Sequence, residues 1–447
     1  MLKIFKFLYQ IIGFLLFWYS KEKLNKDAEF LSNKEIKKFL NKKNDGLLLD
    51  GDRKRLSQKH SFEHLSLIAR TWWWKTTGFI IPNILTLDNC SIIVTDPSGE
   101  IRAKTKESLV RRWFNIIVLN PTNLKESQTF NPLLRASTDE EIKEISKILV
   151  NSSDSSNNSG DSFWNSWAEK IINIILKCLK NKEQLDKVEV NLKDVQRQLN
   201  YFLTKKFDEF VATYGDDDLI DEYKWFISWN EKTTQSFLST AQISLDSLSN
   251  PNISNFLATN SIEFQNLRDS KTVVFFQIPE SKVPHYSFLL NLFYTQFFAF
   301  AMEDLKNTKL PIYCLLDEFG NMSIPYFSTI ITTIRKYKVS ISIVLQSISQ
   351  LEVKYWRDNA NIILNWWISS KIFYSWCDPS TTRMLSEIIG VTTNKNEDTN
   401  YKNKENLLNA SNIRTLEDNQ ALYIYSNKLP ILLNLTPYYK NKRFRYY

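Results

Sequence analysis

"IYCLLDEFG", residues 312–320, is the stretch of sequence that decides the fold. Its apolar residues predict a buried β-strand, and two adjacent acids, Asp317 and Glu318, follow the last of them. In open α/β sheets, ligands bind beyond the carboxyl ends of the strands. The pattern therefore predicts a sheet strand that ends in two carboxylates at a ligand-binding edge. A pair of acids after a strand also occurs as a plain solvated turn, and this alternative stays open here.

A second stretch, "ARTWWWKTTGF" at residues 69–79, has the setting of a phosphate-binding loop. An apolar run precedes it and a helical one follows it. In the pattern G-x-x-x-x-G-K-[ST], the lysine reaches the β- and γ-phosphates and the hydroxyl binds Mg²⁺. Lys75 and Thr76 match the last two positions, but Ala69 and Trp74 occupy the two glycine positions. As written, the motif fails, because indole rings would fill the space that the phosphates need.

The rest of the chain predicts an α/β fold with a helical insertion. Apolar runs that predict further strands are "CSIIVTD" (90–96), "FNIIVLNP" (114–121), "KTVVFFQIP" (271–279), "VSISIVLQS" (339–347) and "QALYIYS" (420–426). A helix is expected at about 325–338, and residues 138–262 have helical periodicity throughout. Residues 392–413 are polar and predict a loop.

The composition limits the function classes. A net charge of +8 fits an anionic partner, either nucleic acid or a membrane surface, although a lysine-rich solvated surface explains it equally well. The four cysteines form no C-x-x-C pair and there are only three histidines, so neither a zinc site nor a disulfide framework is expected.

The N-terminus is mostly apolar. Its uncharged stretch, residues 7–19, is shorter than the roughly 20 residues that cross a bilayer, and counting from Leu2 makes a marginal span. A membrane anchor and a buried or interfacial helix both remain open. Lysines that follow the stretch favour a cytoplasmic body.

Seven blocks of sequence, taken together, resemble one family. They are "LIARTWWWKTTGFIIPNIL", "SIIVTDPSGEI", "TFNPLL", "DSFWNSWAEKII", "NEKTTQSFLSTA", "LLDEFGNMSIPYF" and "SIVLQSISQLEVKYW". Their order and spacing are similar to those of the type IV secretion coupling proteins, the TraG/TraD-type conjugative DNA-transfer ATPases, over roughly residues 60–437. The resemblance implies a RecA-like P-loop NTPase domain with an all-α insertion and an N-terminal hydrophobic membrane-anchor helix.

The resemblance also implies a division of the chain. It consists of a membrane anchor (1–22), a linker (23–60), the nucleotide-binding domain in two parts (61–137 and 263–437), the all-α insertion (138–262) and a basic tail (438–447). The family acts as a homo-hexamer in the bacterial inner membrane, with its motor domain in the cytoplasm. Its partners are single-stranded DNA, as a relaxase–DNA complex, and inner-membrane components of the secretion system. Its cofactors are ATP and Mg²⁺.

Site residues follow by position. The resemblance implies that the nucleotide is bound by Thr71, Trp72, Trp73, Trp74, Lys75, Thr76 and Thr77, and that Thr76 and Asp317 bind the metal. It implies catalytic roles for Glu318 as the base that activates water, Gln346 as a γ-phosphate sensor, and Arg335 as an arginine finger across a subunit boundary. A basic residue on a helix surface is the alternative for Arg335.

Tryptophan stands where the family pattern expects glycine. The positions are Trp72, Trp73, Trp74, Trp113, Trp167, Trp229, Trp356 and Trp376, with Trp366 and Trp367 as further candidates, whereas Trp18, Trp164 and Trp225 look ordinary. The chain has nine glycines and 13 tryptophans; nine is about 2% of the chain, against a usual glycine content of about 7%. We hypothesise that UGA encodes glycine in the source organism and that tryptophan results from decoding under another code.

The sequence therefore predicts an ATP-driven motor that pumps single-stranded DNA, with or without an attached protein, provided that positions 72–74 are glycine in the native protein. Two alternatives remain. If the tryptophans are literal, the chain is an ATPase-inactive relic whose indole rings stack on bases. Alternatively, the motor recruits secreted effector proteins rather than DNA.

Overall fold

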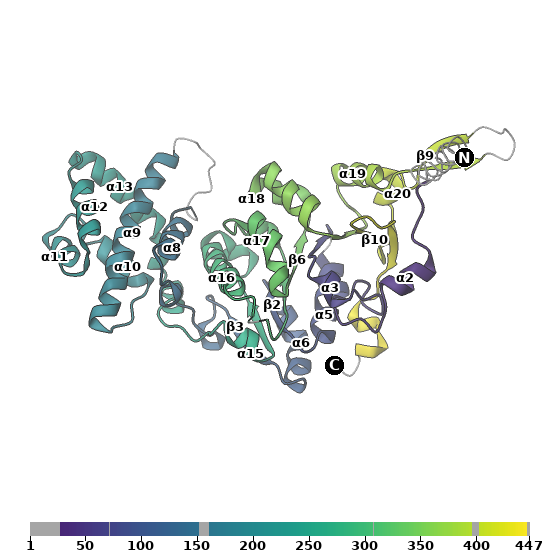
Figure 1. The fold of residues 1–447 in the computed structure, drawn as a ribbon, viewed down its shortest axis with the longest axis horizontal. Coiled ribbons are helices and arrows are strands. Elements are labelled where there is room, and N and C mark those ends of the chain that lie inside the picture. The colour runs from purple at the N-terminus through teal and green to yellow at the C-terminus, as the bar shows by residue number, and fades with distance from the viewer. Residues whose placement is uncertain (1–26, 71, 152–160, 307, 396–401, 445–447) are drawn as a thin grey trace, which may run out of the picture.

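The computed structural model describes residues 27–70, 72–151, 161–306, 308–395 and 402–444. A sheet of nine strands crosses the centre of the molecule, and a lobe of helices extends from one side of it (Figure 1). The strands are β1 (Leu65–Ile68), β2 (Ser91–Thr95), β3 (Asn115–Leu119), β4 (Thr272–Phe276), β5 (Ile312–Leu316), β6 (Val339–Leu345), β7 (Ser370–Tyr374), β10 (Gln420–Tyr425) and β11 (Ile431–Asn434).

The strand order is β11-β10-β7-β1-β6-β5-β2-β4-β3. The seven strands from β7 to β3 are parallel, and β10 and β11 add an antiparallel edge. Because parallel strands end at a common edge, the residues after β1, β2, β5 and β6 meet there. This arrangement confirms the expected α/β fold and brings the predicted site residues of three strands together.

Successive side chains of the central strands face two separate cores. On β5, Cys314 and Leu316 point into one cluster, and Tyr313 and Leu315 point into the other. Burial on both faces explains why these strands read as continuous apolar runs. The first core is covered by α16 (Val283–Glu303) and α17 (Phe327–Thr333), and the second by α5 (Ile81–Thr86) and α6 (Glu100–Arg111).

Further helices lie outside the helical lobe. They are α2 (Asn33–Phe39), α3 (Gln58–Ser61), α4 (Trp72–Lys75), η1 (Thr76–Ile80), η2 (Leu124–Glu126), α7 (Pro132–Arg135), α15 (Asn266–Asp269), η4 (Glu280–Lys282), η5 (Phe319–Asn321), η6 (Ile334–Tyr337), α18 (Ile348–Asn361), η7 (Ile362–Trp367), α19 (Pro379–Ile389), α20 (Ala410–Arg414), η8 (Tyr438–Lys440) and η9 (Lys442–Phe444).

The segment expected as a linker contributes to the core. Leu47, Leu48 and Leu49 are fully buried, and the side-chain amide of Asn83 on α5 holds both the backbone N–H and the carbonyl of Leu48, each at 2.8 Å. Residues 47–49 are therefore part of the body around the sheet rather than a free tether.

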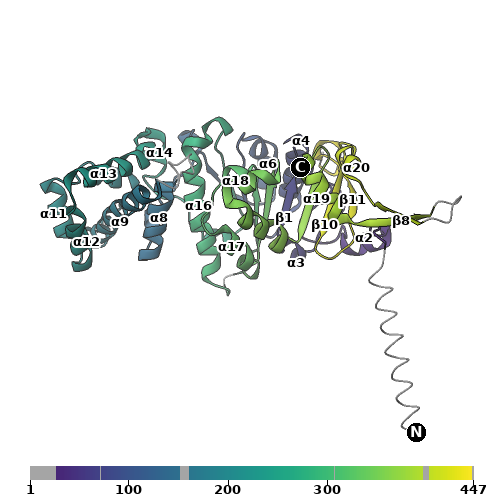
Figure 2. The same cartoon turned by 90° about the horizontal axis from the view of Figure 1, so that it is seen from above.

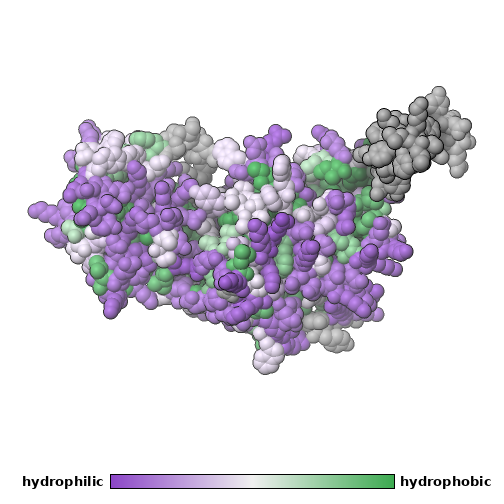
Figure 3. Space-filling model, in the orientation of Figure 1, coloured by the Kyte–Doolittle hydropathy of each residue, from purple (hydrophilic) through white to green (hydrophobic). Residues whose placement is uncertain are grey.

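The helical lobe follows β3. It comprises α8 (Asp139–Asn151), α9 (Asp161–Asp186), α10 (Leu192–Leu199), α11 (Lys205–Tyr214), α12 (Asp217–Ile227), α13 (Glu231–Ser244), η3 (Asp246–Ser249) and α14 (Pro251–Phe256). In both views of the ribbon this lobe lies at the end of the molecule opposite β8 and β9 (Figures 1 and 2). Hydrophilic side chains cover most of its face in Figure 3.

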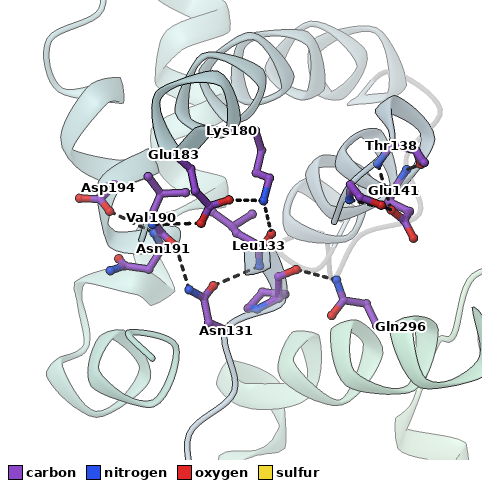
Figure 4. A network of polar contacts seen from close by, with 12 residues as sticks. Asn131, Leu133, Thr138, Glu141, Lys180, Glu183, Val190, Asn191, Asp194 and Gln296 are labelled. Carbon is purple, nitrogen blue, oxygen red and sulfur yellow. Dashed lines mark hydrogen bonds and ion pairs between the residues drawn. The ribbon is translucent and has the colours of Figure 1, made fainter. Parts of the chain in front are cut away.

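Side-chain hydrogen bonds to backbone carbonyls fix the joint between the lobe and the part of the chain around the sheet (Figure 4). The Asn131 amide donates to the Val190 carbonyl at 2.8 Å, and the Lys180 ammonium donates to the Leu133 carbonyl at 2.9 Å. On the side of the sheet, the Gln296 amide of α16 donates to the Pro132 carbonyl at 2.7 Å. Residues 131–133 are thus held by both parts of the chain.

Two differences from the expected elements lie near the C-terminus. The polar stretch at 392–413 contains a two-stranded hairpin, β8 (Val391–Lys395) with β9 (Lys402–Asn406), and the helix α20, where a loop was expected. The hairpin stands apart from the main sheet, so it needs no apolar alternation to form. The expected last strand, β10, is followed by one more, β11.

The predicted membrane anchor, residues 1–22, lies outside the described residues. Within the part of the chain that the structure describes, no helix combines the length and the hydropathy that a membrane crossing requires.

Three tryptophans have the backbone conformation of glycine. Trp113, Trp356 and Trp376 have φ angles of 62°, 62° and 67°. At Trp356, ψ is 152°, a combination that essentially only glycine adopts without strain. All three belong to the positions at which the family pattern expects glycine.

Because Trp356 is 69% exposed, its side chain contributes little burial that could offset the strain. We expect Trp356→Gly to raise the free energy of unfolding by about 1–2 kcal/mol, seen as an increase of a few degrees in Tm. Trp356→Ala is the control, since alanine removes the indole but keeps the Cβ. Equal Tm changes for the two variants would contradict a backbone origin of the strain.

Candidate functional site

The predicted phosphate loop is closed into a helix. After β1, residues 72–75 form α4 and residues 76–80 form the π-helical turn η1. A phosphate nest needs successive backbone N–H groups turned toward the anion, which requires positive φ at some positions and therefore glycine. Three tryptophans disfavour such angles, and the helical turn is the conformation that they can adopt. Thr71 lies outside the described residues.

Lys75 is fully buried and points to the predicted carboxylates. Its Nζ lies 2.7 Å from Oε1 of Glu318, and the amide of Gln346 donates to Oε2 of the same carboxylate at 3.0 Å. The three residues follow β1, β5 and β6, which are neighbours in the sheet in the order β1-β6-β5. The fold therefore brings together a predicted phosphate ligand, a predicted base and a predicted sensor.

Asp317 lies at the same edge, and within the described part of the chain it forms no ion pair. Burial raises the pKa of its carboxyl to about 7, and the charge of Lys75 opposes this shift while those of Glu318 and Asp96 add to it. Its Oδ1 accepts the backbone N–H of Glu318 at 3.1 Å. A buried carboxylate with an elevated pKa gains most from a nearby cation, which fits a metal ligand.

The chain turns sharply directly after the two acids. Glu318 has a φ of 51°, in the left-handed region, and this conformation directs its carboxylate back toward Lys75. The next residue, Phe319, stacks on Tyr355 of α18, with ring centroids 5.7 Å apart. The Tyr355 hydroxyl accepts the N–H of Ile324 at 3.0 Å. α18 thus holds the loop that positions Glu318.

Thr76 and Thr77 follow Lys75 on η1, and Thr77 is buried. The hydroxyl of Tyr374, at the end of β7, lies close to the next residue: a Cβ placed on Gly78 would be 3.6 Å from it. This hydroxyl is buried, and the described residues offer it no hydrogen-bond partner. Buried polar groups are normally hydrogen-bonded, so the turn at residues 76–80 leaves the Tyr374 hydroxyl unsatisfied.

Arg335 is not part of this cluster. It is exposed on η6, before β6. Burial lowers the pKa of His64, which precedes β1, and the charge of Arg335 adds to this shift. Because η6 precedes β6 and His64 precedes β1, Arg335 lies toward the amino ends of the strands, away from Lys75 of the same chain.

Sequence reasoning did not assign Gln277 at the end of β4. Its amide donates to Oδ2 of Asp96 at 3.0 Å, and Asp96 also accepts the N–H groups of Ile101 and Arg102 at the start of α6. Asp96 therefore caps α6 and orders this part of the edge. The signal in the sequence was a polar residue directly after an apolar strand.

A family model described as "Type IV secretory system Conjugative DNA transfer" matches residues 18–446. The chain is 21% identical to the protein VirD4 of Rhizobium radiobacter over 417 residues, which is 86% of this chain and 58% of that protein. It is 23% identical to the type IV secretion system-coupling protein VirD4 of Bartonella quintana over 412 residues, 85% of this chain and 63% of that one. The chain thus spans about 60% of the length of these relatives.

Solved structures show the same fold. The plasmid coupling protein TrwB in complex with ADP and Mg²⁺ superposes with a TM-score of 0.73 at 14% identity, over 92% of this chain and 94% of TrwB. TrwB in complex with the GTP analogue GDPNP gives the same TM-score, identity and coverage. VirB4 of Thermoanaerobacter pseudethanolicus is less similar, with a TM-score of 0.57 at 11% identity over 89% of this chain and 97% of VirB4.

The match of the family model over nearly the whole chain agrees with the buried lysine, the two carboxylates and the glutamine at one edge of the parallel sheet. The protein belongs to the conjugative DNA-transfer family of type IV secretion, the TraG/VirD4-type coupling proteins.

Proposed function

We propose that the chain is an ATP-driven motor that moves single-stranded DNA, alone or with an attached protein, into a type IV secretion channel. The observation that carries the proposal is the cluster of Lys75, Glu318 and Gln346 at the carboxyl edge of the sheet. ATP and Mg²⁺ are its proposed cofactors. TrwB, which has the same fold, has been solved with ADP and Mg²⁺.

The proposed cycle begins with an exchange of partners at Lys75. In the present arrangement Glu318 satisfies the lysine, so an entering triphosphate must replace that carboxylate. The release of Glu318 leaves it free to accept a proton from the attacking water, and Gln346 stays beside it to position that water. Binding of the phosphates and activation of the base are thereby one event.

Thr76 and Asp317 would hold the metal. In the described residues no three His, Cys, Asp or Glu side chains converge as a metal site, but Mg²⁺ beside phosphates needs only one or two protein ligands. Bound there, the ion would neutralise the charge that the triphosphate brings to the site.

We further propose a homo-hexamer at the inner membrane in which Arg335 acts on the nucleotide of the neighbouring subunit. Its exposure, and its position away from Lys75 of its own chain, support this role. The membrane attachment, the secretion-system partners and the domain boundaries given above belong to the same proposal.

The distribution of charge suggests how the cargo is handled. Residues 138–262 contain 20 acidic and 13 basic residues, a net charge of −7, although the whole chain carries +8. The remainder of the chain therefore has a net charge of +15, which favours binding to the phosphate backbone of DNA. The acidic insertion is unsuited to DNA and favours a protein attached to it, so a receptor for effector proteins remains the second candidate function.

We also propose that positions 72–74 are glycine in the native protein. The helical closure of the phosphate turn and the left-handed tryptophans elsewhere support this. The gene provides the test: UGA codons are expected at positions 72–74. UGG codons there, or tryptophan in a peptide of the native protein, would contradict the proposal and favour the nucleic-acid-binding relic.

Glu318→Gln and Lys75→Ala should each abolish DNA-stimulated ATP hydrolysis, because one removes the proton acceptor and the other the phosphate ligand. The measurement is phosphate release from the chain with its native residues at 72–74, together with far-UV circular dichroism to verify folding. Lys177→Ala, which removes an ion pair on the helical lobe, is the control and should keep full activity. Unchanged turnover in either site variant would remove that residue from the mechanism.

Asp317→Asn should stabilise the folded protein while it abolishes Mg²⁺-dependent activity. Because the pKa of Asp317 is raised to about 7, the carboxyl is ionised only at a cost, and stability falls as pH rises from 4 through 7. We expect a gain on the order of 2–4 kcal/mol at pH 8 and clearly less at pH 6, measured by thermal unfolding without nucleotide. A gain that is the same at both pH values would contradict the shifted pKa.

A further inference from the structure

The last described segment of the chain, residues 436–444, passes beside the phosphate turn. The N–H of Thr436 donates to the Asp50 carbonyl at 2.9 Å, and η8 contacts η1. Gly51 lies between the two segments: a Cβ there would be 2.1 Å from the Thr436 carbonyl oxygen and 3.0 Å from that of Gly78. From the sequence, residues 438–447 had been interpreted only as a basic tail.

This segment is fixed at its far end as well. The side-chain amide of Asn441 donates to the Gly51 carbonyl at 3.0 Å and to Oδ1 of Asp52 at 3.1 Å. Phe444 is buried in the second core. The residues between Thr436 and Asn441 are therefore held on a defined backbone, which is a condition for a precise contact with a ligand.

Two tyrosines occupy this backbone. Tyr438 is half-buried and packs against the second core, as Trp74 does, whereas Tyr439 is 45% exposed. The two rings are perpendicular, with centroids 5.6 Å apart. Burial raises the pKa of Tyr438, and the charge of Glu100, the first residue of α6 after β2, adds to this shift. The pair thus lies near the same sheet edge as Asp317.

The position of a bound nucleotide follows from the phosphate ligands. The lysine of a phosphate loop reaches the β- and γ-phosphates, and the backbone N–H groups of the same turn hold the α- and β-phosphates. A triphosphate bound there would lie against the turn that ends in Lys75, Thr76 and Thr77, with its nucleoside beside that turn. η8 contacts η1, which contains Thr76 and Thr77.

We propose that Tyr439, supported edge-on by Tyr438, stacks on the base of the bound nucleoside triphosphate. The proposal rests on the proposed function and adds the subsite for the base. A ring face does not read the polar edge of a base, so adenine and guanine stack equally well. Tyr439 is then a residue that raises nucleotide affinity without selecting between the two purines.

The test is calorimetric titration of the full chain, with its native residues at 72–74, with ATP, GTP and inorganic tripolyphosphate in the presence of Mg²⁺. Tyr439→Ala should weaken ATP and GTP about 5- to 100-fold and leave tripolyphosphate unchanged, because only the base loses a contact. Tyr439→Phe should restore both nucleotides. Tyr201→Ala, on the helical lobe, is the matched control and should change none of the three affinities.

An equal loss of affinity for ATP and tripolyphosphate, or no loss for either, would overturn the proposed stacking while leaving the phosphate site intact. A parent chain that binds neither ligand would overturn the proposed function, and the stacking role with it.

Discussion

The buried ion pair between Lys75 and Glu318 is the interaction on which the rest of the site depends. It joins the turn after β1 to the turn after β5 across the intervening β6, which contributes Gln346 to the same carboxylate. Two charges removed from water are costly, and breaking such a pair from one side costs about 3–5 kcal/mol. A triphosphate offers Lys75 a more highly charged partner, so it can make the exchange favourable.

The same pair explains why the phosphate turn can close without unfolding the sheet. With Lys75 satisfied by Glu318, residues 72–80 can form a continuous helical stretch, and no buried cation is left without a partner. Among the described residues, the buried hydroxyl of Tyr374 beside Gly78 has no hydrogen-bond partner, so this packing leaves one polar group unsatisfied. Glycines at 72–74 would give the backbone the positive φ angles that an open nest requires. Under the proposed function, the identity of these three residues decides whether the protein can bind ATP.

Much of the fold was predictable because parallel strands buried on both faces are continuous apolar runs. β2, β3, β4, β5 and β6 were all expected within a few residues of where they lie. The hairpin of β8 and β9 was not, because its residues are polar and its pairing leaves no apolar pattern. The contribution of residues 47–49 to the core was also missed, because these three leucines lie within a charged, helix-prone stretch that was interpreted as a linker.

The members of the site were predictable by type and position, but their partners were not. Lys75 and Glu318 are 243 residues apart in sequence, and only the strand order makes them neighbours. The family pattern gave Arg335 a catalytic role, and the structure adds that it is distant from its own Lys75. Tyr439 carried no motif at all; its significance depends on the contact between η8 and η1.

The most direct test of the central claim is ATP binding by two matched chains, one with tryptophan and one with glycine at positions 72–74. The glycine chain should bind Mg²⁺-ATP, and the tryptophan chain should not. Equally tight binding by both would contradict the claim that the turn needs glycine, and absence of binding by both would contradict the assignment of a nucleotide-driven motor.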